Sequence, residues 1–169
     1  MTRVLITGMS GTGKSTALAE LARRGHRVVD ADLSTWSIEV ASRDGTGVEQ
    51  LWRTEEMNAL LAQHVNGWFF VAGCASNQGS FYDRFDAVVL LSAPRAIMLQ
   101  RIASRSTNPF GKEAREQQRI LADLETVEPL LRATSTAEIV TTIPMTEVVD
   151  KLESVARRAS EQRSGRTGV

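Results

Sequence analysis

Five short apolar segments recur along the chain, each followed by a polar loop or by a stretch with helical periodicity. These segments occupy residues 3–7, 26–32, 68–72, 86–92 and 138–142. The segment at 68–72 is apolar without interruption, as expected for a strand that is covered on both faces. Strands that alternate with helices are typical of a parallel sheet, so the pattern predicts an α/β fold.

Helical periodicity of the apolar residues accounts for most of the remaining chain. We expect helices over residues 15–24, 48–65, 94–105, 120–131 and 144–159. Pro129 interrupts the fourth of these, whereas Pro94 and Pro144 open the third and the fifth, where the missing backbone N–H is tolerated. We expect one domain over residues 1–160 and a flexible polar tail at 161–169.

Residues 8–15 read G-M-S-G-T-G-K-S and match the phosphate-binding pattern G-x-x-x-x-G-K-[ST] at every fixed position. The match lies between the first predicted strand and the first predicted helix, where the positive end of the helix dipole favours an anion. Gly8, Gly11 and Gly13 let the backbone turn sharply and point its N–H groups inward. We therefore expect a polyphosphate to bind here, and we name residues 8–15 the phosphate loop.

Side chains of the phosphate loop complete the expected nucleotide site. Lys14 is expected to reach the β- and γ-phosphates of ATP, and the Ser15 hydroxyl is expected to be a ligand of Mg²⁺. Thr12 and Thr16 belong to the same expected set of nucleotide-binding residues. The alternative is a structural glycine loop that binds no nucleotide.

Composition narrows the classes of function. The 169 residues are 42% hydrophobic and 24% charged, as in an ordinary globular domain. Twenty basic and twenty acidic residues cancel, which argues against a nucleic-acid polymer or a membrane surface as partner. The first strand begins almost at once and no apolar run is long enough to span a bilayer, so we expect a cytoplasmic protein without a signal peptide. Cys74, the single cysteine, leaves no internal disulfide and no cysteine-based zinc site.

Two acidic residues end the second predicted strand. Asp30 and Asp32 are two positions apart, so their side chains point the same way along a strand. Ligands of parallel sheets bind outside the carboxyl ends of the strands, which places both acids near the phosphate loop. We expect Asp32 to hold hydrated Mg²⁺ or to accept the proton of an attacking acceptor hydroxyl, with Asp30 in support. An aspartate pair that opens the next helix is the alternative.

The segment after the third predicted strand mixes amides, aromatic residues and an arginine. Gly73 opens it, and Asn77, Gln78 and Tyr82 follow. Because irregular segments at that end of a sheet carry many binding sites, we expect Gly73, Asn77 and Gln78 to contact a substrate. A polar surface loop is the alternative.

Arginines gather on both sides of a turn-rich segment, S-T-N-P-F-G-K. Arg101 and Arg105 precede it, and Arg115 and Arg119 follow it, each pair four residues apart. Like charges at that spacing disfavour a helix slightly, so they suggest that an anion binds transiently between the arginines. We expect a lid at about 105–115 that folds over ATP, with Arg105 and Arg115 in catalysis and Arg105 also in nucleotide binding. Two solvated helix ends are the alternative.

The motifs together resemble shikimate kinase and its relatives among the nucleoside monophosphate kinases, and the likeness runs to about Ala159. Asp30 and Asp32 match the family's D-x-D. Residues 47–56, G-V-E-Q-L-W-R-T-E-E, are similar to its G-E-x-x-F-R-x-x-E. Residues 128–144 are similar to its last helix before the fifth strand, the strand itself and the adenine-flanking loop.

This resemblance assigns roles to single residues. Arg53 takes the place of the family's acceptor-binding arginine, Arg132 matches an arginine that contacts substrate, and Pro144 lies in the adenine-flanking loop. On spacing alone, Arg53 and Glu56 are three positions apart on a predicted helix, so a solvated ion pair is the alternative. After the third strand, a family shikimate kinase carries three glycines where this chain has Gly73-Cys74-Ala75.

The family implies a three-layer αβα fold with a five-stranded parallel sheet in the order 2-3-1-4-5. It also implies ATP-dependent transfer of the γ-phosphoryl group to a small-molecule acceptor, with ATP and Mg²⁺ as cofactors. A second hypothesis is a nucleoside monophosphate kinase. In it, Asn77, Gln78 and Tyr82 bind the base of the substrate nucleotide, and arginines bind the phosphate of that nucleotide. These arginines are Arg53, Arg84 and Arg132. A third hypothesis is an ATP-binding switch or slow ATPase without a small-molecule acceptor.

Overall fold

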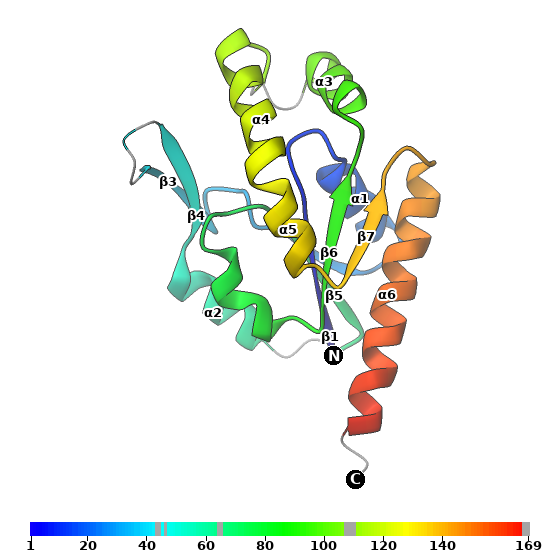
Figure 1. Ribbon diagram of the computed structural model, residues 1–169. Helices are drawn as coiled ribbons and strands as arrows, with labels where there is room; N and C mark the ends of the chain where they lie inside the picture. The colour runs from blue at the N-terminus through cyan, green and yellow to red at the C-terminus, as the bar shows by residue number, and fades with distance from the viewer. Residues whose placement is uncertain (43–44, 46, 64–65, 107–110, 167–169) are drawn as a thin grey trace.

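A parallel sheet of five strands runs through the centre of the computed structural model, which describes residues 1–42, 45, 47–63, 66–106 and 111–166 (Figure 1). In spatial order the strands are β2 (Arg27–Asp30), β5 (Trp68–Ala72), β1 (Thr2–Thr7), β6 (Ala87–Ser92) and β7 (Ala137–Val140). When only these five are counted along the chain, the order reads 2-3-1-4-5, so the predicted topology is confirmed. β1 lies at the centre and pairs in parallel with both β5 and β6.

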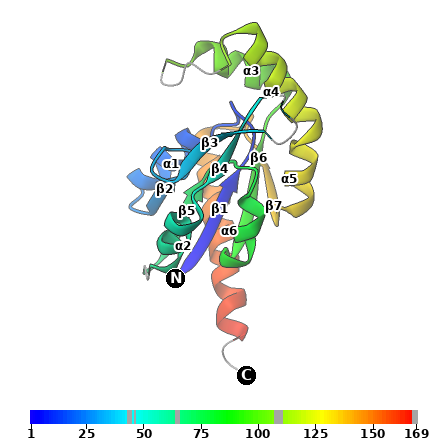
Figure 2. The same ribbon diagram turned by 90° about the vertical axis from the view of Figure 1, so that its left-hand side faces the viewer.

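Helices cover both faces of the sheet, as predicted. On one face α1 and α6 pack over Val4 and Ile6, and on the other face α2 and the 3-10 helix η1 pack over Leu5. The bounds are Lys14–Arg23 for α1, Met145–Arg166 for α6, Thr54–Ala62 for α2 and Gln78–Arg84 for η1. Because neighbouring residues of β1 face opposite layers and both layers are apolar, the strand is apolar at consecutive positions. Figure 2 shows α6, orange to red, passing behind β1 and extending beyond the N-terminus.

A third apolar cluster lies beyond the carboxyl ends of the strands and joins the phosphate loop to three further helices. These are α3 (Arg95–Ser104), α4 (Ala114–Thr126) and α5 (Glu128–Thr134). Met9 of the phosphate loop packs there with Met98 and Ile102 of α3 and with Ile120 of α4. The break between α4 and α5 falls at Val127, two residues before Pro129, where we predict an interruption. The cluster therefore holds α3 and α4 beside the phosphate loop (Figure 1).

The helix predicted over residues 48–65 is wrong in its first part. Val48–Trp52 is a strand, β4, which pairs in antiparallel register with β3 (Ser37–Ala41), and α2 begins only at Thr54. Leu51 and Trp52 fit a helical stripe, but the cross-strand partners of β4 satisfy its backbone instead. The hairpin formed by β3 and β4 projects from the five-stranded sheet, at the end where the parallel strands have their carboxyl ends (Figure 1).

Two further boundaries differ from expectation. The segment after β5 is not an irregular loop throughout, because η1 begins at Gln78. α6 is helical as far as Arg166, although we expect a flexible tail from residue 161, and residues 167–169 lie outside the described chain. Among the described residues, no helix combines the length and the apolar character needed to cross a membrane.

Candidate active site

The glycines of the phosphate loop are required by close packing of its backbone. Gly8, Gly11 and Gly13 have φ angles of 147°, 82° and 98°, which side chains of L-residues rarely allow. A Cβ atom on Gly8 would lie 2.3 Å from the Leu91 carbonyl oxygen, and one on Gly11 would lie 2.8 Å from the Met98 carbonyl oxygen. Gly13 directly precedes α1, so the free N–H groups of the first turn of this helix face the loop.

Side chains from two distant segments brace the phosphate loop from outside. Thr12 is buried and donates its hydroxyl proton to the Met9 carbonyl at 2.8 Å, and Thr141 donates to the Thr12 carbonyl at 2.8 Å. Arg101 of α3 donates to the Gly11 carbonyl at 3.3 Å and to the Thr141 hydroxyl at 2.9 Å. Thr12 and Arg101 therefore shape the loop through its backbone. The same bonds hold residues 141–144, including the exposed Pro144, beside the loop.

The side chains expected to contact phosphate and metal lie at the open side of the loop. Lys14 donates from Nζ to the Gly8 carbonyl at 2.7 Å and to the Met9 carbonyl at 3.4 Å. Ser15 and Thr16 lie in the first turn of α1 and are exposed. Lys14 is thus held by carbonyl groups that a bound phosphate oxygen could replace, and the Ser15 hydroxyl is accessible.

The four arginines near the predicted lid do not converge on one place. Arg105 donates to the Ser10 hydroxyl of the phosphate loop at 3.4 Å, and burial lowers the pKa of its guanidinium. Arg115 is exposed in the first turn of α4. Arg119 donates to the Val48 carbonyl at the start of β4, and so joins α4 to the hairpin. Of the predicted lid, residues 107–110 lie outside the described chain.

Asp32 lies between the phosphate loop, through the charge of Lys14, and the hairpin, through the Gln50 amide. Its Oδ1 accepts the Cys74 N–H at 2.9 Å, and Asp30 supports it from β2 by accepting the Asp32 N–H at 3.0 Å. Burial raises the pKa of Asp32, although the positive charge of Lys14 lowers it in part. A Cβ atom on Gly73 would lie 2.9 Å from Asp32 Oδ1, so glycine is needed to leave room for the carboxylate.

A cavity of about 460 Å³ opens between Asp32 and the hairpin. Its lining residues are Asp32, Ser34, Ser37, Ile38, Glu39, Gln50 and Arg53. The Gln50 amide donates to the Asp32 carbonyl at 3.2 Å and to the Ser37 hydroxyl at 3.0 Å, which fixes the wall between β3 and β4. Asp32 and Arg53, both predicted as substrate-binding residues, are therefore brought together at one cavity. Its mixed polar lining suits a small hydroxylated molecule.

The residues contributed by the hairpin are the ones that sequence reasoning misses. Residues 37–41 and 48–52 flank a glycine-containing turn, and S-I-E-V-A alternates in polarity. Two such segments around a short polar turn are a recognised hairpin signal, which the helical stripe of Leu51 and Trp52 masks. Asp123 of α4 is also missed. It is half-buried, burial raises the pKa of its carboxyl group, and its charge acts on the neighbouring Cys74.

The two amides predicted to contact substrate are both hydrogen-bonded to other groups of the protein. Gln78 is 3% exposed, its Oε1 accepts the Thr7 hydroxyl at 3.2 Å, and its Nε2 donates to the Tyr82 hydroxyl at 2.7 Å. Asn77 binds the backbone of Trp52 with both ends of its amide. Neither residue lines the cavity, so both support the walls of the site.

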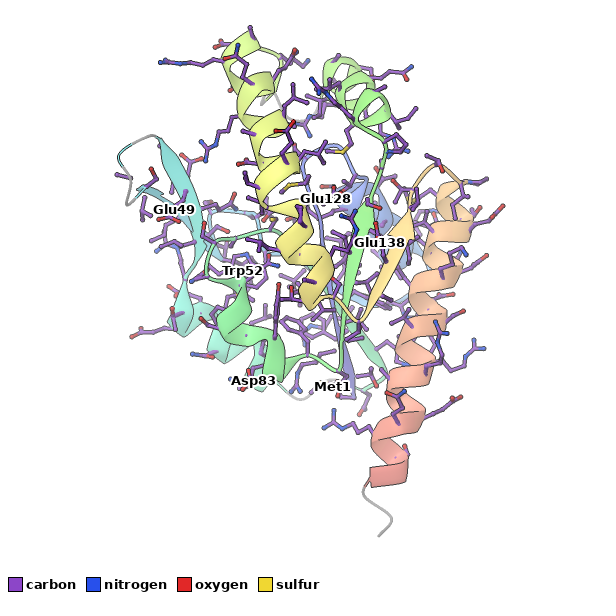
Figure 3. All side chains as sticks on the ribbon, in the orientation of Figure 1. Met1, Glu49, Trp52, Asp83, Glu128 and Glu138 are labelled. Carbon is purple, nitrogen blue, oxygen red and sulfur yellow. The ribbon has the colours of Figure 1, made fainter. Side chains whose placement is uncertain are left out.

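Arg132 also lies apart from the cavity. It donates to Glu128 Oε1 at 2.7 Å and to Glu138 Oε2 at 2.8 Å, and these two hydrogen bonds raise its pKa. Figure 3 shows Glu128 and Glu138 near α5 and β7, well separated from Glu49 on the hairpin. Arg132 therefore joins α5 to the sheet.

Among the described residues, the acidic side chains do not gather into an all-protein metal cage. Within the part of the chain that the structure describes, no group of three or more histidine, cysteine, aspartate or glutamate residues could hold a metal ion. Mg²⁺, however, is ordinarily held by one or two protein oxygens together with phosphates and water. Ser15, next to Lys14 in the chain, and Asp32, on which the charge of Lys14 acts, fit that kind of donor set.

Comparison of the sequence with known proteins shows which proteins this chain is similar to. A sequence profile described as AAA domain matches residues 4–122, which is more than half of the chain. The dephospho-CoA kinase of Helicobacter pylori (strain J99) is 26% identical over 160 aligned residues, which cover 72% of this chain and 80% of that protein.

Solved structures share the fold. The shikimate kinase of Acinetobacter baumannii, in complex with shikimate, is similar with a TM-score of 0.65 at 20% identity, covering 92% of each chain. A gluconokinase of Sinorhizobium meliloti 1021 has a TM-score of 0.62 at 18% identity, covering 97% of each chain. The predicted resemblance to kinases with a phosphate loop is thereby confirmed, and the likeness to these structures establishes the fold.

Proposed function

Because this chain belongs to the AAA domain family, with a complete phosphate loop, we propose that it is an ATP-dependent kinase acting on a small molecule. The reaction is transfer of the γ-phosphoryl group of ATP to a hydroxyl group of the acceptor. One observation carries the proposal: the cavity of about 460 Å³ is lined by Asp32, the same carboxylate on which the charge of Lys14 acts. A nucleotide on the phosphate loop and an acceptor in the cavity would therefore meet at Asp32.

The nucleotide side of the site binds charge mainly through the backbone. The N–H groups of the phosphate loop and of the first turn of α1 take the phosphates, and Lys14 adds a positive charge. Thr16 is exposed beside Ser15. Pro144, also exposed, would border the adenine, as the family resemblance implies. Ser15 and Asp32 would hold Mg²⁺, which would neutralise charge that develops on the phosphates. Arg105, beside Ser10, would support the transferring group, whereas Arg115 is exposed in the first turn of α4 and would reach that group only if α4 moved toward bound ATP.

The acceptor side orients the attacking hydroxyl. Burial raises the pKa of Asp32, and a carboxylate with a raised pKa is a better base toward an alcohol. Two hydrogen bonds hold Asp32 in place: its backbone N–H donates to the Asp30 carboxylate, and its own carboxylate accepts the Cys74 N–H. Arg53 and Gln50, which also line the cavity, bind the remainder of the acceptor. Chemistry of this kind depends on positioning and on charge stabilisation rather than on a covalent intermediate.

The nucleoside monophosphate kinase hypothesis has less support, because two of the three residues that would bind the base are bonded to other protein groups. The Gln78 amide is hydrogen-bonded to Thr7 and Tyr82, and the Asn77 amide to the Trp52 backbone. In this structure neither amide is available to a base. Other acceptors with a free hydroxyl remain compatible with the mixed lining of the cavity. An ATP-binding switch would need no such cavity.

Acceptor-dependent turnover is the experiment that tests the proposal. ADP release from Mg·ATP should be measured alone and with shikimate, gluconate, dephospho-CoA and nucleoside monophosphates, after a thermal-shift screen for binding. A ligand present at 100 times its dissociation constant adds about 2.7 kcal/mol to stability, which such a screen detects. We expect at least one hydroxylated acceptor to raise ADP release and to gain one phosphoryl group by mass spectrometry.

The matched controls are two variants that separate the sides of the site. Lys14→Ala should lose nucleotide binding and turnover, whereas Asp32→Asn should keep nucleotide binding and lose acceptor-dependent turnover. If ADP release is the same with and without every acceptor in the panel while ATP binds normally, the protein is a switch or slow ATPase.

A further inference from the structure

The side-chain amide of Asn77 is bonded twice to the backbone of one residue of β4. Its Oδ1 accepts the Trp52 N–H at 2.8 Å, and its Nδ2 donates to the Trp52 carbonyl at 2.9 Å. One position earlier, the Ser76 N–H donates to the Gln50 carbonyl at 2.9 Å. The segment after β5 therefore runs along the outer edge of β4. The Asn77 amide takes the place of a neighbouring strand and satisfies both polar groups of Trp52.

Trp52 is the last residue of β4, and the next residue is the arginine that lines the cavity. The Arg53 N–H donates to the Trp36 carbonyl at 2.7 Å, and its Nε donates to the Ser34 carbonyl at 3.3 Å. Within the described part of the chain, its two terminal guanidinium nitrogens have no protein partner. The Trp52 indole is 1% exposed and packs against Phe81 with ring centroids 5.7 Å apart. The backbone at Trp52 is thus held from both sides, by packing and by Asn77.

We propose that Asn77 is a positioning residue: its amide fixes the backbone at the junction of β4 and α2 and so holds Arg53 at the wall of the acceptor cavity. The role in turnover rests on the proposed function, because it requires that Arg53 bind the acceptor. An arginine side chain loses much rotational freedom on binding, and a fixed backbone with Nε already bonded to Ser34 removes part of that cost. Asn77 thus contributes to acceptor affinity without contacting the acceptor.

The kinetic test compares Asn77→Ala with two control variants. Asn77→Ala should raise the KM for the acceptor by about tenfold or more, since misplacement by an ångström can cost far more. Its kcat at saturating acceptor and its KM for ATP should stay within about twofold, because uniform binding is lost and no transition-state contact is removed. Ser76→Ala, in the same segment, keeps its backbone bond to Gln50 and should behave as wild type. Val155→Ala on α6 lowers stability far from the site and controls for destabilisation.

A ligand-free measurement tests the positioning itself. Amide hydrogen exchange at Trp52 should become about tenfold faster or more in Asn77→Ala, because the acceptor of that N–H is removed and local opening becomes easier. The Arg53 Nε–H resonance should broaden or shift in the same variant. Ser76→Ala and Val155→Ala should leave both signals as in wild type.

Each outcome decides the proposal. Unchanged Trp52 exchange in Asn77→Ala overturns it, and so does faster exchange with an unchanged acceptor KM. Loss of kcat and ATP affinity in parallel with melting temperature, as Val155→Ala would give, makes Asn77 a structural residue only. If wild-type protein shows no acceptor-dependent turnover, the proposed function fails, and the exchange and resonance of residues 52 and 53 still decide whether Asn77 fixes this junction.

Discussion

The two sides of the candidate active site are built differently. The phosphate loop is one continuous segment, and its groups for binding are mostly backbone N–H groups shaped by glycines. The acceptor cavity has walls from residues 32–39 and 50–53, and residues 73–77 support it from behind. On the nucleotide side, a Cβ at Gly8 would meet a carbonyl oxygen at 2.3 Å. On the acceptor side, the arrangement depends on side-chain hydrogen bonds between segments.

This difference explains which kinds of change each side tolerates. The phosphate loop has little room for added atoms at Gly8 and Gly11. The acceptor side has space in its cavity, but its geometry depends on Gln50 and Asn77, whose amides join separate segments. We expect substitutions on the nucleotide side to act on binding of ATP and on transfer. Substitutions on the acceptor side should act on orientation and on acceptor affinity.

The largest expected effect is that of Lys14→Ala, which removes the point charge of the nucleotide side. Among the described residues its Nζ donates to two loop carbonyls, so the fold should stay intact with a loss of about 1 kcal/mol or less. ATP affinity should fall and phosphoryl transfer should drop to background, because the lysine acts on the phosphates. Calorimetric titration with ATP and a turnover assay measure both. Equal ATP affinity in the two proteins would contradict the assignment of the phosphate loop.

Asp32→Asn should have the next largest effect and should separate the two sides. The amide keeps the size of the side chain and can still accept the Cys74 N–H, but it is no longer a base or an anionic metal ligand. We expect kcat to fall by about 10²–10⁴-fold, the range for a positioned general acid or base, while ATP affinity changes much less. Undiminished kcat at saturating substrate would place Asp32 among the structural residues.

The same variant should be more stable than wild type at neutral pH. Burial raises the pKa of Asp32 in the folded chain, so above the unfolded pKa the ionised carboxylate opposes folding. Asp32→Asn should therefore raise the melting temperature at pH 7, with each kcal/mol worth about 2–4 °C for a chain of this size. The gain should shrink as the pH falls through the folded pKa and vanish below the unfolded one. A gain that grows on acidification would show that burial of charge is not the cause.

Arg105 and Arg115 provide a comparison within the predicted lid. Arg105 lies 3.4 Å from the Ser10 hydroxyl, whereas Arg115 is exposed on α4. We expect Arg105→Ala to lose about a hundredfold or more in kcat, or roughly 2.7 kcal/mol, with a near-normal melting temperature. Arg115→Ala should lose less unless α4 moves toward bound ATP. Steady-state kinetics with both variants measures this, and normal turnover in both would reduce the arginines to solvated helix ends.

The parts of the fold that could be predicted from sequence are those that depend on local pattern. The phosphate loop is recognised because its required residues fall within eight consecutive positions between a strand and a helix. The continuous apolar segment at 68–72 predicts a strand with the same bounds as β5. The order of the sheet follows from the family resemblance, and the pairing of β1 with β5 and β6 confirms it.

The acceptor side could not be predicted to the same degree because its contacts join distant segments. Val48–Trp52 pairs with Ser37–Ala41 as a strand, and the local hairpin signal around the turn is masked by the helical stripe of Leu51 and Trp52. An amide after a strand suggests a ligand contact from sequence alone, yet Asn77 binds a residue 25 positions earlier in the chain. Which partner a polar side chain finds depends on the tertiary fold, so the sequence predicts its chemistry better than its role.

The smallest expected effect is that of Arg132→Ala, which tests whether the family resemblance or the observed contacts assign this residue. Its guanidinium donates to Glu128 and Glu138, and the bond from Arg132 lowers the pKa of Glu138. The arginine side chain is 45% exposed, so solvent screens the pair and its loss should cost about 1 kcal/mol or less. The melting temperature should then fall by about 2–4 °C at most, with kcat and acceptor KM unchanged.

The pH dependence and a paired variant sharpen this last prediction. A carboxylate with a lowered pKa contributes stability above the unfolded pKa that is lost as the pH falls through the folded one. The difference in melting temperature between wild type and Arg132→Ala should therefore narrow on acidification. Adding Glu138→Gln to Arg132→Ala should cost little more than the single change, because the two residues share one interaction. A rise in acceptor KM with an unchanged melting temperature would instead show that Arg132 reaches the acceptor, and that the cavity extends toward α5 when substrate binds.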